Sequence, residues 1–486
     1  MLIHMIGICG TGMGSLAGLL SEAGHTVRGS DENVYPPVST LLQERGIPIL
    51  QGYKAAHIAG DGPRPDLVVV GNIANQANPE VQALLQSGIE YLSMPQAIAR
   101  FFLASRHPVV VAGTHGKTTT TAMIARMLME SGRDPSFLVG GVLRDLGSSY
   151  RLGKGSPNEP FVIEGDEYET SFFDKGPKFL HYMPRTAVLT SVEYDHAEMF
   201  PSLEAVQEAF RSFVALVPPA AGGGCLAVCA DDPLAAELGA ACRGRIIPYG
   251  MGPGAEVAGR LIQAGPDGMS FLVTVDGGDF GRFSIRATGD HNLRNALSAV
   301  AVGRVLGLGP EEIARGLAAF DGVRRRQEVR GAAGGVTVID DFAHHPTAVR
   351  ETIRAIKARF PGQRLWAVFE PRTNTTRRDV FQRDYAASFD GADEVLVAPV
   401  DHPERAPEGR RFSVERLIAD LRARGVKASA QEGVEAIVAS VADRARRGDV
   451  VLVMSNGGFG GIHGKLLSAL ESRAAAEAGG RPGAAR

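Results

Sequence analysis

A single short stretch, Val109 to Thr119, limits the possible folds of this chain more than any other feature. It combines an apolar strand, a glycine-rich turn and the start of a helix in the sequence VVVAGTHGKTT. Gly113 and Gly116 let the backbone turn its N–H groups inward, Lys117 can reach terminal phosphates, and the Thr118 hydroxyl suits Mg²⁺. The helix start adds the positive end of its dipole. The stretch therefore predicts a phosphate-binding loop in an α/β domain.

Composition and charge exclude several classes of protein. The chain has 51 Lys and Arg against 54 Asp and Glu, so we expect small polar or anionic ligands, with no nucleic acid and no membrane as partners. The N-terminus lacks the basic region and cleavage site of a signal peptide, and no apolar run approaches the roughly 18–20 residues that cross a bilayer. Four cysteines in 486 residues favour a reducing, cytoplasmic location without a disulfide framework.

The first segment has the order of a dinucleotide-type βαβ unit. An apolar run from Leu2 to Ile8 leads into the glycine-rich turn Gly7 to Gly14, a helix, and a second strand from Thr26 to Asp31. The acid Asp31 follows the turn by about 20 residues, the spacing at which an acid meets a ribose hydroxyl. Ser15 replaces the third glycine of the fingerprint, so a turn made for packing alone stays open as an alternative.

Metal-binding residue types follow two strands of the central segment. Glu164, Asp166 and Glu167 come after the first of these strands, and Glu193, Asp195 and His196 come after the second. Ligands gather at the carboxyl ends of parallel strands, so we expect these side chains to converge on the crevice that holds Lys117. Further along, Asn292 opens an alanine-rich helix, where it either contacts a base or phosphate or serves as an ordinary helix cap.

The third segment repeats the alternation of strand and helix. A strand from Val336 to Ile339 is closed by Asp340 and Asp341, and strands at Leu365–Phe369, Glu394–Val400 and Val450–Met454 follow a helix at Thr347–Arg359. Such alternation predicts a parallel sheet with helices on both faces. We therefore predict an α/β protein of three domains, with a Rossmann-like domain at residues 1–105, a P-loop ATPase-like α/β domain at 106–325, a C-terminal Rossmann-like α/β domain at 326–472, and a flexible tail at 473–486.

Taken together, these motifs resemble those of the Mur ligases, the ATP-dependent amide-forming ligases of bacterial cell-wall (peptidoglycan) synthesis, over nearly the whole chain. The matching residues are Gly113 to Thr118, Glu164, Asp195-His196, His291 to Asn295, Arg326-Gln327-Glu328 and Asp340 to Pro346. Within the family, the chain is most similar to the members that act in murein recycling. The segments that favour them are Gly7 to Thr11, Asn33 to Pro37, Glu167-Tyr168 with Phe172 to Lys175, Glu370 to Thr375, and Ser455 to His463.

The resemblance implies a ligase that uses ATP and Mg²⁺. ATP would phosphorylate the carboxylate of UDP-N-acetylmuramate, and the amine of the tripeptide L-Ala-γ-D-Glu-meso-diaminopimelate would attack the acyl phosphate. The members that add L-alanine to the same sugar are the alternative. A nicotinamide oxidoreductase would explain only the first glycine turn and Asp31, and a non-catalytic nucleotide-binding regulator would not need the metal residues. The resemblance also implies a monomer or weak homodimer that closes about hinges near residues 106 and 326.

It further implies roles for single residues. ATP would be held by Gly113, Thr114, His115, Gly116, Lys117, Thr118, Thr119, Asn292, Arg326 and Asp341. The catalytic set would be Lys117, Glu164, His196, Arg326, Asp341 and His344, with Thr118 and Glu164 on one Mg²⁺ and His196 on a second. The UDP sugar would meet Gly10, Thr11, Gly12, Met13, Ser30 and Asp31.

Two points concern the second metal and the peptide. Several family members hold the second metal with a carbamylated lysine, but this chain has no lysine between Lys178 and Lys357. A planar arginine fork pairs well with peptide carboxylates, so Arg372 is the candidate for binding the tripeptide, with Asn374 and Asn456 beside it.

Overall fold

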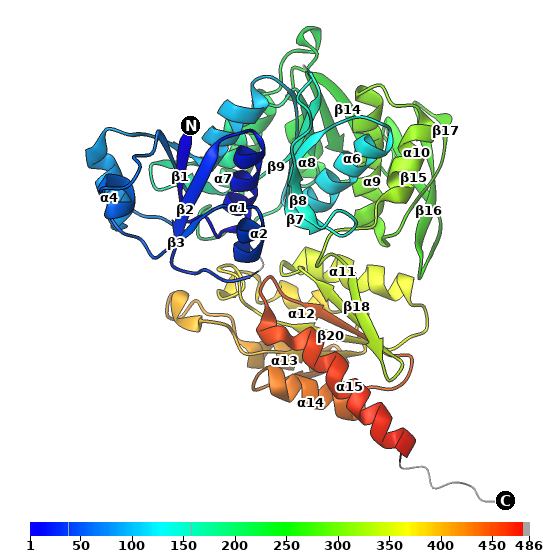
Figure 1. The fold of residues 1–486 in the computed structure, drawn as a ribbon. Coiled ribbons are helices and arrows are strands. Elements are labelled where there is room, and N and C mark those ends of the chain that lie inside the picture. The colour runs from blue at the N-terminus through cyan, green and yellow to red at the C-terminus, as the bar shows by residue number, and fades with distance from the viewer. Residues whose placement is uncertain (37, 157, 480–486) are drawn as a thin grey trace, which may run out of the picture.

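The computed structural model describes residues 1–36, 38–156 and 158–479, and it contains three α/β domains (Figure 1). The first domain is a five-stranded parallel sheet of order β3-β2-β1-β4-β5. Its elements are β1 (Leu2–Ile6), α1 (Thr11–Glu22), β2 (Thr26–Asp31), α2 (Val38–Glu44), β3 (Ile49–Gln51), α3 (Ala56–Ala59), β4 (Leu67–Val70), α4 (Pro79–Ser87), β5 (Glu90–Ser93) and α5 (Met94–Ile98). Along β4, Leu67 and Val69 pack with α1, while Val68 and Val70 pack with α4, so helices cover both faces.

The second domain is built on a ten-stranded sheet of order β17-β16-β15-β14-β13-β12-β6-β9-β7-β8. Its elements are β6 (His107–Ala112), α6 (Lys117–Glu130), β7 (Ser136–Leu143), β8 (Ser148–Arg151), β9 (Pro160–Gly165), β12 (Thr186–Leu189), α7 (Leu203–Ala215), β13 (Cys225–Cys229), α8 (Pro233–Gly239), β14 (Arg245–Gly250), β15 (Val257–Gly265), β16 (Gly268–Val275), β17 (Gly278–Ile285), α9 (Asp290–Val305) and α10 (Pro310–Ala319). The hairpin β10 (Glu169–Ser171) and β11 (Asp174–Pro177) stands apart from this sheet. Strand β6, which leads into the glycine loop, pairs in parallel with β9 and β12.

The third domain has a six-stranded sheet of order β18-β19-β23-β20-β21-β22. Its elements are β18 (Glu328–Ala333), β19 (Val336–Asp341), α11 (Pro346–Arg359), β20 (Leu365–Phe369), α12 (Asp384–Ser388), β21 (Glu394–Val397), α13 (Val414–Ala423), β22 (Lys427–Ala430), α14 (Val434–Arg444), β23 (Val450–Met454) and α15 (Ile462–Gly479). The sequence predicts a parallel sheet, but β18 pairs with β19 in the antiparallel sense. A connection of only two glycines, Gly334 and Gly335, leaves no room for a parallel crossover.

The end of the chain also differs from expectation. Helix α15 continues to Gly479 and projects away from the rest of the molecule in Figure 1, so residues 473–479 are helical where the sequence predicts a tail. Residues 480–486 of that predicted tail lie outside the described part of the chain.

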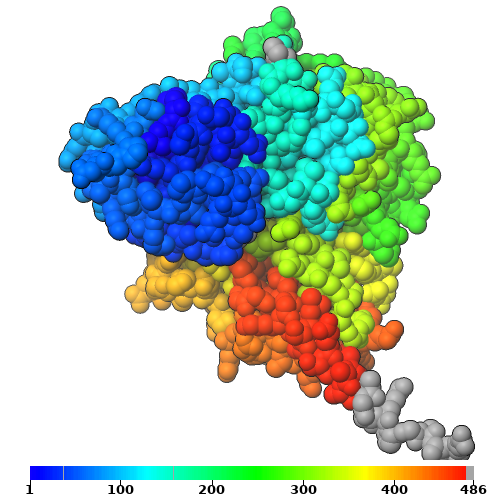
Figure 2. Space-filling view, in the orientation of Figure 1, coloured from blue at the N-terminus to red at the C-terminus, as the bar shows by residue number. Residues whose placement is uncertain are grey.

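The first two domains share one apolar core. Met5 of β1, Phe161 of β9 and Phe210 of α7 belong to the same buried cluster. Helix α1 packs so closely on β8 that a Cβ at Gly18 would lie 1.8 Å from the Tyr150 hydroxyl oxygen. Figure 2 shows these two domains, blue and cyan to green, as one continuous mass above the third. The predicted hinge near residue 106 is therefore bridged by close apolar packing.

The third domain meets the second through polar and aromatic contacts instead. Its buried apolar clusters contain only residues from Ala333 onward. The Thr375 hydroxyl donates to Asp195 Oδ1 at 3.1 Å, and Arg378 Nη1 donates to the Ala197 carbonyl at 3.1 Å. Such an interface separates at lower cost than a shared apolar core, so we expect domain movement to occur about the linker near residue 326.

Two expectations from composition can be compared with the structure. All four cysteines are free, and burial raises the pKa of Cys225 and Cys229 to about 11, so both are neutral thiols at pH 7. Among the described residues, none of the helices has the length and apolar character that a membrane span requires.

Candidate active site

The glycine loop between β6 and α6 has a backbone that only glycine accommodates. Gly113 and Gly116 have φ angles of 136° and 84°, which L side chains rarely adopt. A Cβ at Gly113 would lie 2.0 Å from Thr190 Oγ1, and one at Gly116 would lie 2.5 Å from Asn295 Oδ1. Neighbouring segments from β12 and α9 therefore press directly on the loop and fix its shape.

Lys117, the first residue of α6, lies buried between the loop and an acid. Its Nζ donates to the Gly113 carbonyl and to Glu167 Oε2, both at 2.7 Å. Burial alone would lower the pKa of Lys117, but the charges of Glu167 and Asp166 outweigh it, and the pKa is raised. The loop thus holds a fixed positive charge. Glu167 lies in the acidic run after β9 that was expected to converge on Lys117, but its pairing with the lysine was not predicted.

Thr118 and Glu164, the pair predicted to share a Mg²⁺, are in contact. The Thr118 hydroxyl donates to Glu164 Oε2 at 3.1 Å, and the Gly140 N–H donates to Glu164 Oε1. Burial, with Asp166 as a second cause, raises the pKa of Glu164 to about 7. Carboxylate and hydroxyl oxygens that gather beside a phosphate-binding loop are the donor set that Mg²⁺ prefers, so the residues present fit this ion.

His196, predicted for a second metal, lies on the other side of Glu167. Its Nε2 is 3.5 Å from Glu167 Oε1, and its Nδ1 is 3.4 Å from Glu198 Oε1. Burial opposes protonation, but the hydrogen bonds to Glu167 and Glu198 raise the pKa of His196 to about 10. Glu167 therefore joins the lysine of the loop to this histidine.

The linker into the third domain brings Arg326 to the same place. Arg326 Nη2 donates to Thr118 Oγ1 at 3.4 Å, and its guanidinium lies 5.0 Å from the centre of the Phe342 ring. Asp341 accepts backbone N–H bonds from Gln327 and Ala343, each at 2.8 Å. Its carboxylate therefore holds the linker that carries Arg326, and burial raises its pKa.

Of the two remaining residues predicted near ATP, Asn292 is buried and His344 is partly exposed. His344 lies near enough to Asp195 and Arg326 for their charges to influence its pKa, which burial lowers. Asn292 is inside the first turn of α9 and is not its cap, which is Gly289. The Asn292 Nδ2 donates to the Thr288 carbonyl at 2.9 Å.

In the first domain, the predicted residues fall into two groups. Gly10 caps α1, and Gly10 and Thr11 are exposed, while Met13 is buried. Ser30 and Asp31 are buried and face inward: the Ser30 hydroxyl donates to Glu80 at 2.5 Å, and Asp31 accepts from the backbone of Cys9 and Asn33. Asp31 therefore holds the glycine turn in shape, and its side chain does not project from it.

The predicted peptide residues lie at the carboxyl end of the third sheet. Arg372 is 40% exposed, with its Nε 3.7 Å from Asp401 Oδ2. It lies across Gly457, where an added Cβ would be 2.4 Å from Arg372 Nη1. Asn456 Oδ1 is buried without a hydrogen-bond partner in the described structure. Asn374 is exposed and accepts from Arg377 at 3.1 Å, so it is linked to a different arginine.

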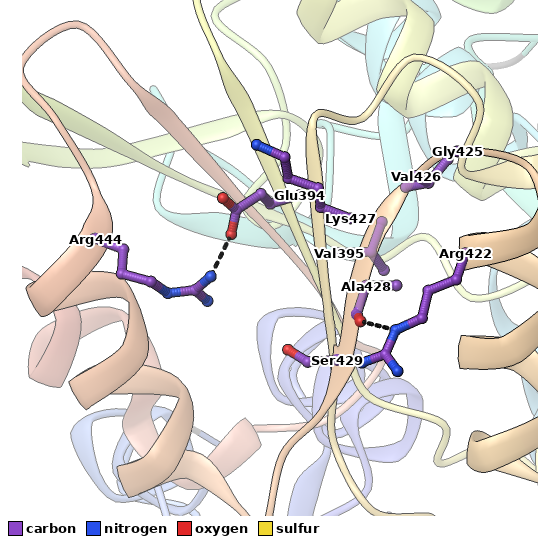
Figure 3. Close-up of a pocket in the computed structure, with 9 residues that line it drawn as sticks. All are labelled: Glu394, Val395, Arg422, Gly425, Val426, Lys427, Ala428, Ser429 and Arg444. Carbon is purple, nitrogen blue, oxygen red and sulfur yellow. Dashed lines mark hydrogen bonds and ion pairs between the residues drawn. The ribbon is translucent and has the colours of Figure 1, made fainter.

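A pocket of about 520 Å³ lies elsewhere on the third domain (Figure 3). It is lined by β21, β22 and the ends of α13 and α14, with Arg444 paired to Glu394 and Arg422 donating to the Ala428 carbonyl. None of the predicted site residues lines it.

Comparison with known protein families finds matches in three successive regions of the chain. Residues 2–106 match the Mur ligase family, catalytic domain; residues 111–303 match the Mur ligase middle domain; and residues 325–457 match the Mur ligase, glutamate ligase domain.

Full-length relatives extend this match. The chain is 42% identical over 479 residues to the UDP-N-acetylmuramate–L-alanyl-gamma-D-glutamyl-meso-2,6-diaminoheptandioate ligase of Escherichia coli (strain K12), covering 98% of this chain and 100% of that protein. A UDP-N-acetylmuramate–L-alanine ligase of Roseiflexus sp. (strain RS-1) is 38% identical, covering 93% and 96% of the two chains. The crystal structure of a murein peptide ligase from Psychrobacter arcticus 273-4 is 36% identical, with a TM-score of 0.71 over 97% of this chain and 99% of that one. The chain therefore belongs to the Mur ligase family of ATP-dependent, amide-forming enzymes.

Proposed function

We propose that this enzyme joins L-Ala-γ-D-Glu-meso-diaminopimelate to UDP-N-acetylmuramate at the expense of ATP, in the recycling of murein peptides in the cytoplasm. The end-to-end identity of 42% to the Escherichia coli ligase named for this tripeptide carries the choice of amine. The L-alanine ligase reaction is the second candidate, because relatives named for it reach 38% identity over 93% of the chain.

The reaction follows from the chemistry of a carboxylate, which is a poor electrophile. An oxygen of the muramic acid carboxylate attacks the γ-phosphorus of ATP, and the bond to ADP breaks. The amine nitrogen then attacks the carbonyl carbon of the acyl phosphate, loses a proton, and phosphate leaves as the amide forms. Phosphoryl transfer needs alignment and charge neutralisation more than a covalent nucleophile. A partly buried loop with a fixed cation at Lys117 supports this chemistry.

In this proposal, the ATP phosphates lie on Gly113 to Thr119, and Arg326, Asp341 and Asn292 shape the nucleotide end of the site. Lys117 exchanges its ion pair with Glu167 for the phosphates. Mg²⁺, which supplies charge neutralisation when bound, is held by Thr118 and Glu164, and a second ion by His196 with Glu167. His344, whose pKa is lowered by burial, is placed near the reacting groups.

The two organic substrates approach from opposite domains. The first domain, residues 1–105, holds the UDP sugar with its diphosphate at Gly10 to Met13, where the first turn of α1 begins. Ser30 and Asp31 act through the shape of the turn. The third domain, residues 326–472, holds the peptide carboxylates at Arg372, with Asn374 and Asn456 nearby. A monomer or weak homodimer is sufficient, because each proposed contact comes from one chain.

Phosphate release with different amines tests this function. We expect the enzyme, given ATP, Mg²⁺ and UDP-N-acetylmuramate, to release phosphate with the tripeptide and not with free L-alanine. Release with L-alanine alone would assign the second candidate reaction. Release with neither amine would contradict both.

A further inference from the structure

Beside the phosphate loop, three side chains from distant segments meet, and two of them, Glu193 and His345, have no role in the reaction described above. His115 belongs to the loop, Glu193 follows β12, and His345 caps the N-terminus of α11. Glu193 Oε2 lies 3.2 Å from His115 Nε2 and 3.5 Å from His345 Nδ1. One ligand atom from each residue lies within 4.8 Å of the other two. Two imidazoles and a carboxylate thus converge on a small volume.

The hydrogen bonds of His345 fix which of its nitrogens carries the proton. Nε2 lies 3.2 Å from the Tyr194 carbonyl, which can only accept, so the proton is on Nε2. Nδ1 therefore carries a lone pair, which accepts the Thr347 N–H at 3.3 Å and lies 3.5 Å from Glu193 Oε2. A metal ion at this position takes the lone pair in place of the Thr347 N–H, and its positive charge relieves the repulsion between the nitrogen and the carboxylate oxygen. Burial, together with His115, lowers the pKa of His345 to about 4, so its ring is neutral at pH 7.

The spacing matches a small tetrahedral ion. Metal–ligand bonds of about 2.0–2.1 Å in a tetrahedral site put neighbouring ligand atoms roughly 3.3–3.4 Å apart. The two contacts of Glu193 Oε2, 3.2 and 3.5 Å, lie on either side of that value. Two histidines, one carboxylate and an open position form a donor set that Zn²⁺ takes, whereas Mg²⁺ prefers oxygen ligands. The bond from His345 Nε2 to the Tyr194 carbonyl is the outer contact that metal-binding histidines usually make.

We propose that His115, Glu193 and His345 form a site for Zn²⁺ or a similar divalent transition-metal ion, separate from the Mg²⁺ site at Thr118 and Glu164. His115 is part of the phosphate loop and His345 belongs to the third domain. An ion bound here links the third domain to the loop, across the interface at which domain movement is expected. We therefore expect the bound ion to raise the thermal stability of the enzyme and to slow its turnover.

Co²⁺ binding to the full-length enzyme tests the site by a spectrum that does not depend on activity. The enzyme is stripped with a chelator and titrated with Co²⁺ in excess Mg²⁺, which occupies the oxygen-rich sites. We expect a single Co²⁺ with the visible absorption bands of low coordination, displaced by Zn²⁺. His345→Asn retains a good helix cap and removes the imidazole, so we expect Co²⁺ affinity to fall at least about 100-fold.

Matched variants separate this site from the other histidines. His402→Asn changes an exposed histidine of the same domain, and we expect it to bind Co²⁺ like the unaltered enzyme. Glu193→Gln, which keeps the side-chain shape, is the second test of the cluster if His345→Asn does not fold. A Co²⁺ band that survives both cluster variants but disappears in His196→Asn would overturn the proposal, as would the absence of any band in the unaltered enzyme.

Discussion

Replacing Lys117 with methionine is expected to lower kcat about 1000-fold, the effect of losing one fixed charge donor from a preorganised site. Lys117 is the buried cation of the phosphate loop, and its only acidic hydrogen-bond partner among the described residues is Glu167. Without this cation, charge that develops on the transferring phosphoryl group has no fixed partner on the loop. Steady-state phosphate release with all three substrates measures the loss.

The control for this variant is Lys154→Met, which changes an exposed lysine of the same domain. Methionine preserves the volume of Lys117 but leaves the buried Glu167 with His196 in place of two cationic partners, so thermal unfolding is measured in parallel. A folded Lys117→Met enzyme with kcat within tenfold of the unaltered one would contradict the assignment of this loop to ATP.

The second large effect is expected at Arg372. Replacing it with alanine removes charge-assisted hydrogen bonds to a peptide carboxylate, at a cost of about 2–3 kcal/mol, or roughly 30- to 150-fold in the KM for the tripeptide. The KM values for ATP and UDP-N-acetylmuramate are expected to stay unchanged, because the Arg372 side chain lies in the third domain across Gly457. Initial rates at varied tripeptide concentration measure the change.

Two further variants test whether a change in the tripeptide KM is specific to the Arg372 side chain. Arg372→Lys keeps the charge but loses the planar fork, so we expect an intermediate KM. Arg383→Ala changes an exposed arginine of the same domain and is expected to behave like the unaltered enzyme. An unchanged tripeptide KM in Arg372→Ala would remove this residue from the peptide site.

Long apolar strands were predictable because buried parallel strands are continuous apolar runs between polar turns. The predicted bounds of β20 (Leu365–Phe369) and β23 (Val450–Met454) agree with the structure. The antiparallel meander β15 to β17 was not predicted, because its strands are partly exposed and lack such a run. The sequences Pro-Asp-Gly before β16 and Asp-Gly-Gly before β17 are hairpin signals that could have revealed it.

The site itself was predictable only in part. The motif gives the loop, Lys117 and the acids at the strand ends, because the carboxyl edge of a parallel sheet collects them. It does not give the pairing of Lys117 with Glu167, which joins residues 50 apart in the sequence through tertiary packing. The inward orientation of Asp31 was equally hidden, because a ribose-binding acid and an acid that holds its own turn have the same spacing. Cluster residues such as His345 meet their partners only when the third domain docks.

Transfer of oxygen-18 tests the central claim most directly. UDP-N-acetylmuramate labelled with oxygen-18 in its carboxylate is incubated with ATP, Mg²⁺ and the tripeptide, and the released phosphate is analysed by mass spectrometry. An acyl phosphate intermediate requires that one carboxylate oxygen leaves with the phosphate, so the account predicts labelled phosphate in equal amount to the amide product. Phosphate without label, formed at the same rate whether or not the tripeptide is present, would show that water is the acceptor and would contradict the account.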